Sequence, residues 1–150
     1  MPETTPVQEI TIKRIFDAPR EQVWEAWTEP EQLARWWGPH GWTNPVERIT
    51  MDVRPGGAFE VTSVSDEDGS EMTVQGIYRE VVEPERIVMD EPAEGAWHDG
   101  AVSVATFTDL RDGRTEMIVR TTIHTTDEMR SVAEAGMATS FDRLAEHLAS

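Results

Sequence analysis

The residue types that most often do chemistry are scattered in this chain. Its four histidines are His40, His98, His124 and His147, and their spacing fits neither an HExxH motif nor another metal-ligand pattern. The chain has no cysteine, which excludes disulfides, thiolate nucleophiles and cysteine-ligated metals. His98 and Asp99 are neighbours and could act as a general acid and base, but an acidic surface loop also contains such pairs by chance. We therefore expect no metal site, no cofactor and no identifiable catalytic residue.

No nucleotide-binding or triad pattern is present either. The run Pro55-Gly56-Gly57 belongs to no GxGxxG or Walker pattern, and the residues after it are strand-like, so it indicates a turn between strands. The order of serines, histidines and aspartates does not by itself indicate a Ser-His-Asp triad.

Arg14 falls on an apolar face. In residues 8–16 the side chains of Ile10, Ile12 and Phe16 alternate with polar ones, and Arg14 is in register with them. A cation on an inner face is costly unless it is paired or hydrogen-bonded. Two interpretations stay open, namely a salt bridge near the edge of the sheet and an anchor for an anionic or carbonyl-bearing ligand.

Three of the six tryptophans lie within seven residues, in the stretch ARWWGPHGW at 34–42. Trp36 and Trp37 are neighbours and cannot share one helix face, so we expect one to anchor a short helix and the other to line the mouth of a pocket. Trp42 would guard the same mouth. Packing without any ligand is the alternative interpretation.

Alternation and turn residues predict the elements that must position these side chains. A strand at 8–16 is followed by Asp17-Ala18-Pro19, which starts a short helix, and by a second short helix at 29–37. Further strand-like runs lie between turn residues at 45–53, 58–65, 71–82, 86–90, 101–109 and 114–124. Thr125 and Glu128 form the capping box of a helix whose apolar stripe continues to Leu148.

The order of elements predicts an α+β fold of a single domain, 1–150, with residues 1–7 as a frayed end. Seven mostly antiparallel strands would form one sheet, and the last helix, about 34 Å long at 1.5 Å per residue, is long enough to cover it. If the sheet curls around that helix, a cavity can remain between the two surfaces.

The charge excludes some classes of partner. Against 29 acidic residues the chain has 13 Lys and Arg, which gives a net charge of -16. Nucleic acids and anionic membrane surfaces both require cationic side chains, so we expect neither as a partner. The first ten residues contain no basic segment followed by an apolar one, and we expect a cytoplasmic protein without a membrane span.

Four stretches of the chain resemble a known family. They lie at 14–39 (RIFDAPREQVWEAWTEPEQLARWWGP), 52–61 (DVRPGGAFEV), 68–88 (DGSEMTVQGIYREVVEPERIV) and 140–150 (SFDRLAEHLAS). In these stretches and in the order of its elements the chain is similar to the activator-of-heat-shock-ATPase-homologue-like family of the START-like superfamily, also called SRPBCC. One departure is Gly136-Met137, where many members carry Gly-Trp, so that a flexible thioether replaces a rigid ring.

The resemblance implies a helix-grip fold, in which an antiparallel sheet wraps around the C-terminal helix and encloses a hydrophobic pocket. Relatives bind lipids, polyketides or hormones, some act as cyclases or aromatase-like enzymes, and one branch stimulates a chaperone ATPase. We expect a small hydrophobic molecule in the pocket, oriented by Tyr78, Thr121 and Ser140. The expected ligand-binding residues are Arg14, Trp36, Trp37, Trp42, Tyr78, Met117, Thr121, Met137, Ser140 and Phe141.

Two other functions stay open. A cyclase, dehydratase or hydrolase acting on a polyketide-like or aromatic substrate would need an ionisable group inside the cavity, for which Arg14 and Tyr78 are the candidates. A module that contacts a chaperone or another protein, or a second copy of the chain, would need an exposed apolar patch.

Overall fold

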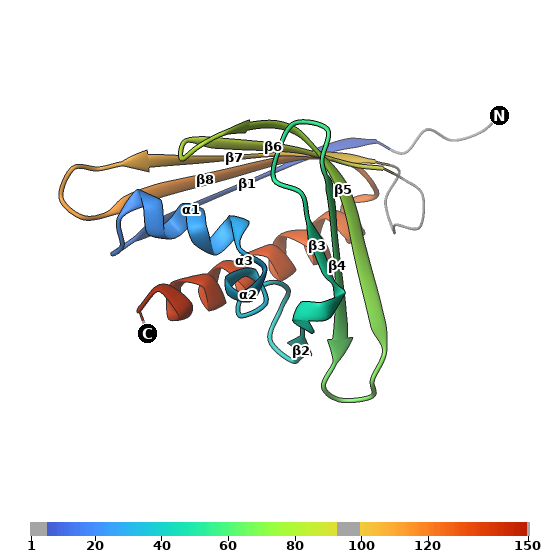
Figure 1. The fold of residues 1–150 in the computed structure, drawn as a ribbon. Helices are drawn as coiled ribbons and strands as arrows, with labels where there is room; N and C mark the ends of the chain where they lie inside the picture. The colour runs from blue at the N-terminus through green and yellow to red at the C-terminus, as the bar shows by residue number, and fades with distance from the viewer. Residues whose placement is uncertain (1–5, 93–99, 150) are drawn as a thin grey trace.

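The computed structural model describes residues 6–92 and 100–149, and within them one curved sheet wraps around a long C-terminal helix (Figure 1). Three helices lie on the inner side of this sheet: α1 (Arg20–Thr28), α2 (Pro30–Leu33) and α3 (Asp127–Ala149). The strands are β1 (Val7–Phe16), β2 (Trp42–Thr43), β3 (Ile49–Met51), β4 (Ala58–Ser65), β5 (Glu71–Val82), β6 (Arg86–Glu91), β7 (Ala101–Asp109) and β8 (Thr115–His124). The predicted helix-grip arrangement is confirmed.

The sheet contains eight strands in the described part of the chain, one more than the sequence predicted. Its order is β1-β8-β7-β6-β5-β4-β2, with β3 also pairing with β4, and every pairing is antiparallel. The additional strand, β2, has two residues, which is too short to produce an alternating pattern. The predicted strand at 45–53 is reduced to β3, because residues Val46–Arg48 form a 3₁₀ turn (η1) before it.

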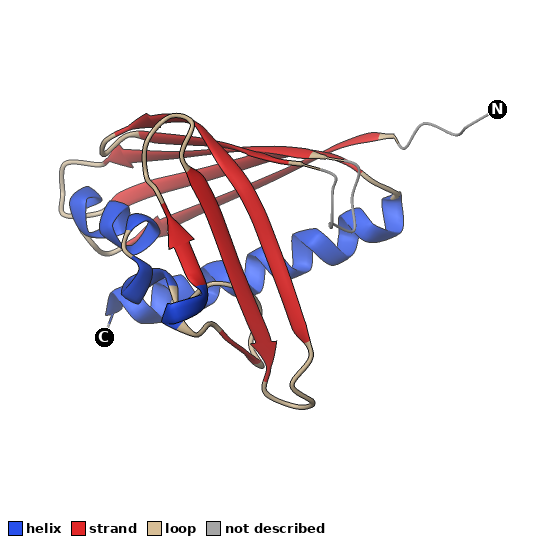
Figure 2. Ribbon diagram, turned by 45° about the vertical axis from the view of Figure 1, so that its right-hand side comes forward, coloured by secondary structure: helices blue, strands red, loops and turns tan. Residues whose placement is uncertain are grey.

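The sheet bends sharply at β5. Between Tyr78 and Glu80 the pairing of β5 with β6 shifts by one residue, so that Arg79 forms a bulge, and a bulge bends its strand and increases the twist. Gly76 lies nearby, and a Cβ atom there would come within 2.8 Å of the Met89 Sδ and 3.0 Å of the Asp90 carbonyl oxygen, so a side chain at this position would require Met89 or β6 to shift. Figure 2 shows the consequence: β4 and β5 turn away from the other strands and pass around one side of α3.

The start of α3 differs from the predicted capping box by one residue. The hydroxyl oxygen of Thr126 accepts a hydrogen bond from the backbone N–H of Met129 at 3.2 Å, as an N-cap side chain does. Thr125, the predicted cap, is buried instead, and its N–H donates to the carbonyl of Pro6. Tertiary contact with the N-terminal strand thus decides which of the two threonines caps the helix.

The two halves of α3 have different environments. Its C-terminal half buries Ser140, Phe141, Leu144 and Leu148 in the core. In the N-terminal half Met129, Ala133 and Met137 are only partly buried, and Val132 is 58% exposed. The helix therefore packs tightly against the fold at one end, together with α1, and stands away from the sheet at the other.

Candidate functional site

A cavity of about 550 Å³ lies where α3 stands away from the sheet. This volume falls within the roughly 300–1,000 Å³ typical of small-molecule sites. The wall contributed by α3 consists of Met129, Val132, Ala133, Gly136, Met137, Ser140 and Phe141. The sheet contributes inward-facing side chains from most of its strands, namely Ile10, Phe59, Met72, Val74, Tyr78, Ile87, Met89, Glu91, Ala101, Ser103, Ala105, Val119, Thr121 and Ile123. The cavity is therefore predominantly apolar.

The tryptophan-rich stretch closes one end of the cavity. We call residues 34–42 the aromatic loop; its Trp36, Trp37, Gly38, Pro39 and Trp42 all line the cavity. Helix α2 ends at Leu33, earlier than the sequence predicted, so the two neighbouring tryptophans lie in a turn and both reach the cavity. Trp36 is fully buried and donates from its Nε1 to the carbonyl of Ala26 at 2.9 Å, whereas Trp37 is only partly buried.

The rings at this end form one connected cluster. Trp36 contacts Trp27 with ring centroids 5.0 Å apart, and Trp37 contacts Phe59 at 5.3 Å in an edge-on geometry. Ring contacts continue from Trp27 to Phe107 and from Phe59 to Tyr78. Trp27 of α1 also lines the cavity. Since aromatic pairs of this kind stabilise each other beyond simple burial, the cluster is a rigid wall.

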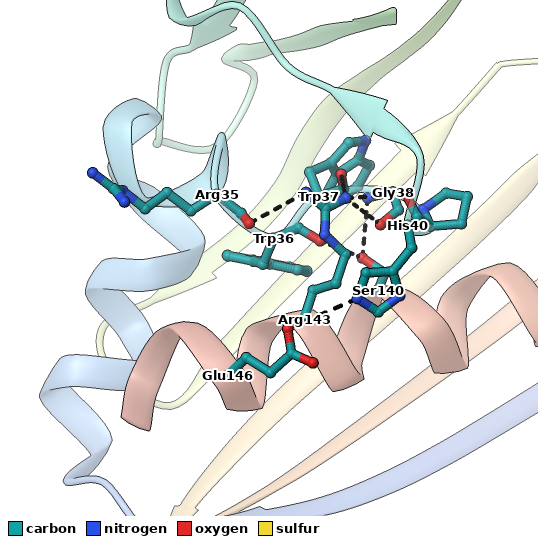
Figure 3. Close-up of polar contacts among 9 residues, drawn as sticks. Arg35, Trp36, Trp37, Gly38, His40, Ser140, Arg143 and Glu146 are labelled. Carbon is teal, nitrogen blue, oxygen red and sulfur yellow. Dashed lines mark hydrogen bonds and ion pairs between the residues drawn. The ribbon is translucent and has the colours of Figure 1, made fainter. Parts of the chain in front are cut away.

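Three polar side chains bind the carbonyl groups of the aromatic loop, and we call them the carbonyl clasp: Asn44, Ser140 and Arg143. The Arg143 Nη1 donates to the carbonyls of Trp37, Gly38 and Pro39 at 3.0, 2.8 and 3.1 Å, and its Nη2 donates to that of Arg35 at 3.3 Å. Figure 3 shows Arg143 and Ser140 reaching from α3 to this loop, with the His40–Glu146 ion pair beside them.

The other two members complete the clasp. The Ser140 hydroxyl donates to the Trp36 carbonyl at 3.0 Å and accepts from the N–H of Gly38 at 3.1 Å. The amide of buried Asn44 donates to the carbonyls of Ala34 and Trp37. Every carbonyl from residue 34 to residue 39 thus accepts a hydrogen bond from a side chain, so the loop is fixed to α3 although Ser140 and Arg143 are about a hundred residues away in sequence.

The most unusual side chain in the lining is Glu91, which the sequence analysis did not consider. It follows Ile87 and Met89 on the inner face of β6, at the end of the strand. The Glu91 side chain is partly buried, and burial raises the pKa of its carboxyl group to about 7. The alternation of β6 could have placed Glu91 on the inner face, but the predicted strand ended at residue 90.

Two further polar groups of the lining lack partners among the described residues. They are the Tyr78 hydroxyl and the Trp27 Nε1, both buried. Burial raises the pKa of Tyr78, and the nearby charge of Asp52 adds to this, so the phenol stays protonated. Because buried polar groups are nearly always hydrogen-bonded, these two donors are available to an acceptor such as a water or a ligand atom.

Most of the expected ligand-binding residues line the cavity: Trp36, Trp37, Trp42, Tyr78, Thr121, Met137, Ser140 and Phe141. Of the three polar groups expected to orient a ligand, two are already engaged: Ser140 belongs to the carbonyl clasp, and the Thr121 hydroxyl bonds that of Ser103 at 2.9 Å. Tyr78 is the one whose hydroxyl has no partner in the described part of the chain.

Arg14 and Met117 are absent from the lining. Arg14 lies on β1 at the edge of the sheet, where its Nη2 is 3.7 Å from the Asp142 Oδ1 of α3, which matches the salt-bridge interpretation. Met117 of β8 is fully buried and pairs with Phe107 of the neighbouring strand β7. The ring of Trp24 in α1 packs against Phe107. Arg14 and Met117 both lie at the end of the sheet where helices fill the space, so no cavity reaches them.

Other kinds of site gain no support. Within residues 6–92 and 100–149, no three His, Asp or Glu side chains come together in a way that could hold a metal ion. His98 and Asp99, the pair considered above, lie outside the described residues. None of the helices that the structure describes is both long and apolar enough to cross a bilayer.

With this geometry in place, comparisons with known proteins are informative. Residues 17–149 match the family described as Activator of Hsp90 ATPase homolog 1-like protein. A search of the curated proteins found no match.

Solved structures share the fold over nearly their whole length. A protein from Chromobacterium violaceum is 26% identical and has a TM-score of 0.79, with 93% of this chain and 96% of that chain covered. An AHSA1 protein from Silicibacter pomeroyi is 22% identical with a TM-score of 0.81, covering 95% and 98% of the two chains. An AHSA1-like protein from Aeromonas hydrophila is 20% identical with a TM-score of 0.78, covering 93% and 91%.

Proposed function

The chain belongs to the family of Activator of Hsp90 ATPase homolog 1-like proteins, and we propose that it binds a small hydrophobic molecule in the cavity between α3 and the sheet. The observation that carries the proposal is the cavity itself, because about 550 Å³ lined mainly by apolar and aromatic side chains remains unfilled in a fold with a well-packed opposite end. Protein interiors are normally close-packed, and apolar voids of this kind take up apolar molecules readily.

The hydrophobic effect supplies the driving force. Each 100 Å² of apolar surface that a ligand and the wall remove from water contributes about 2.5 kcal/mol. A ligand of two or three rings would bury several times this area, which is enough to offset the loss of translational and rotational freedom.

The carbonyl clasp supports the same function. A loop that must be ordered when a ligand binds reduces the affinity, whereas the aromatic loop is already held by Asn44, Ser140 and Arg143. The ring cluster is therefore presented in its final arrangement before any ligand arrives.

The proposal can be tested with a neutral apolar fluorophore such as prodan. Saturable binding, with energy transfer from the tryptophans that line the cavity, is expected for the wild-type protein. In the variant Met137→Trp the larger side chain should extend into the cavity and reduce the affinity at least about tenfold, since it occupies the volume that the probe needs.

The matched control is Ala135→Trp, which adds the same ring to an exposed position of α3 outside the lining and should leave the affinity within about twofold. Equal binding by both variants, or non-saturable binding by the wild-type protein, would contradict the proposal.

A further inference from the structure

In the described part of the cavity wall, Glu91 is the one acidic side chain. Among the described residues that line it, Glu91 and Tyr78 are the titratable ones, and none is Lys, Arg or His. Across the sheet, Glu91 pairs with Ala101 of β7, and Ala101 in turn pairs with Ile123 of β8, so both neighbours in this row are apolar. On α3, Arg130 and Glu134 pair with each other at 2.9 Å and do not line the cavity.

Glu91 has no hydrogen bond or salt bridge from its side chain within the described part of the chain. The neighbouring acid on β6, Asp90, points to the other face of the sheet, where Arg79 binds it at 2.8 Å through Nε. Among the described residues, the acid on the outside of β6 is therefore paired with a cation, whereas the acid on the inside is not. A carboxylate in apolar surroundings is costly unless something compensates its charge.

Aromatic side chains line the same cavity. Seven rings line the cavity: Trp27, Trp36, Trp37, Trp42, Phe59, Tyr78 and Phe141. The face of an indole or phenol ring attracts a cation, and a desolvated contact of this kind contributes about 2 kcal/mol. With a net charge of -16 on the whole chain, the electrostatic potential of the protein also favours a positive ligand over a negative one.

The same face of the sheet carries two hydroxyl groups near Glu91. Ser103 of β7 pairs with Met89, two pairs of residues along from the Glu91–Ala101 pair, and its hydroxyl bonds that of Thr121 on β8 at 2.9 Å. Both residues line the cavity. These two hydroxyl groups are therefore polar atoms of the sheet wall on the same face as Glu91, whereas the rest of the described wall is mostly apolar.

We propose that the ligand of this cavity is a hydrophobic amine, whose protonated nitrogen pairs with the Glu91 carboxylate while its apolar body lies against the aromatic wall. This inference rests on the proposed function and narrows it to one chemical class. Hydrophobic carboxylates such as fatty acids are disfavoured, because two like charges would meet in a cavity whose described lining contains no cation. Burial raises the pKa of Glu91 to about 7, and a cation bound beside the carboxylate would lower this pKa.

The test uses three probes that share a naphthyl ring on a two-carbon side chain and differ in their polar group. They are 2-(2-naphthyl)ethylamine, 2-(2-naphthyl)ethanol and the carboxylate anion of 2-naphthylacetic acid. The amine should bind the wild-type protein most tightly and the carboxylate least. In Glu91→Gln the amine should lose about tenfold in affinity, the alcohol should change less than about twofold, and the carboxylate should gain. The control Glu85→Gln removes the same charge from an exposed position outside the lining and should leave the order of the probes unchanged.

A second measurement needs no variant. The ratio of amine affinity to alcohol affinity in the wild-type protein should rise as the pH increases from about 5.5 to about 8, because Glu91 becomes ionised while the probe stays protonated. This ratio should be flat in Glu91→Gln.

The outcomes separate the two proposals. If the alcohol binds but the amine shows no preference, no pH-dependent ratio and no response to Glu91→Gln, the amine inference is wrong and the hydrophobic pocket stands. If the carboxylate binds as tightly as the amine, the inference is equally overturned. If no probe binds, both proposals fail.

Discussion

At the scale of single residues, Glu91 has an energetic cost that depends on pH. Burial disfavours its charged form and raises the pKa of its carboxyl group from the ordinary value of 4.5 to about 7. A raised carboxyl pKa means that the folded state holds the proton more tightly than the unfolded chain. Its contribution to stability is therefore fully present below about pH 4.5 and is lost as the pH rises through about 7.

The raised pKa of Glu91 predicts how the stability of Glu91→Gln depends on pH in the absence of a ligand. The amide keeps the size of the side chain and cannot ionise, so the variant should be more stable than the wild-type protein at about pH 8, by about 1 to 3 kcal/mol. The two proteins should have equal stability near pH 4.5. Urea unfolding followed by tryptophan fluorescence at both pH values measures the difference.

The other acids titrate in both proteins, so the difference between them isolates Glu91. A variant that is less stable than the wild-type protein at the higher pH would show that the ionised carboxylate has a stabilising partner, and the interpretation of an uncompensated charge would then be wrong.

At the scale of elements, the carbonyl clasp connects the aromatic loop to α3. Arg143 is partly buried, and this burial lowers its pKa from the usual value, which reflects the cost of removing a guanidinium from water. Hydrogen bonds to four loop carbonyls offset that cost. The loop conformation depends both on these bonds and on its own sequence, since Gly38 has a φ of 81°, which favours glycine.

Arg143→Met should therefore destabilise the protein by about 1 to 3 kcal/mol, because it leaves several loop carbonyls without a donor. It should also make the loop tryptophans more accessible to acrylamide quenching. The matched control is Arg35→Met, which makes the same chemical change at an exposed position of the loop and should cost less than about 0.5 kcal/mol. Equal effects of the two substitutions would contradict the clasp.

At the scale of the whole molecule, charge is the dominant feature. The nine salt bridges between described residues are largely exposed, and exposed pairs stabilise a protein by less than about 1 kcal/mol each. A net charge of -16 on 150 residues leaves many acids without a cation, and their mutual repulsion opposes the compact state.

Added salt should therefore stabilise this protein. Raising NaCl from about 0.01 M to about 0.5 M shortens the screening length from roughly 30 Å to a few ångströms, which weakens the repulsion between distant acids. The midpoint of thermal unfolding should rise, and KCl should have the same effect at equal concentration, because screening does not depend on the cation. A falling midpoint would mean that the ion pairs outweigh the repulsion.

Much of the fold could be predicted from local patterns. Alternation along β8 places Met117, Val119 and Thr121 on one face, and the structure buries all three. The helical stripe of α3 and its great length follow from the same kind of periodicity, which is set by backbone geometry alone. These features are local, so a single sequence is enough to reveal them.

The site could be predicted only in part, because a cavity is a relation between elements. The sequence placed Trp36, Trp37 and Met137 among the expected ligand-binding residues, but the bulge at Arg79 and the position of α3 relative to the sheet decide that space remains in front of them. The arrangement of the elements also keeps Arg14 and Met117 out of the cavity lining, because both lie at the end of the sheet where helices fill the space. The tertiary structure also places Glu91 in the cavity lining, one residue beyond the end of the strand predicted at 86–90.

What the sequence by itself determined is therefore the list of elements, the side chains on their inner faces and the family to which the chain belongs. Only the tertiary structure decided where those inner faces separate, which hydroxyls and amides hold the aromatic loop, and which acid lies in the cavity. The physical reason is that periodicity reports how each segment meets an apolar environment, whereas the distance between α3 and the sheet depends on how side chains far apart in sequence fill or fail to fill the same space.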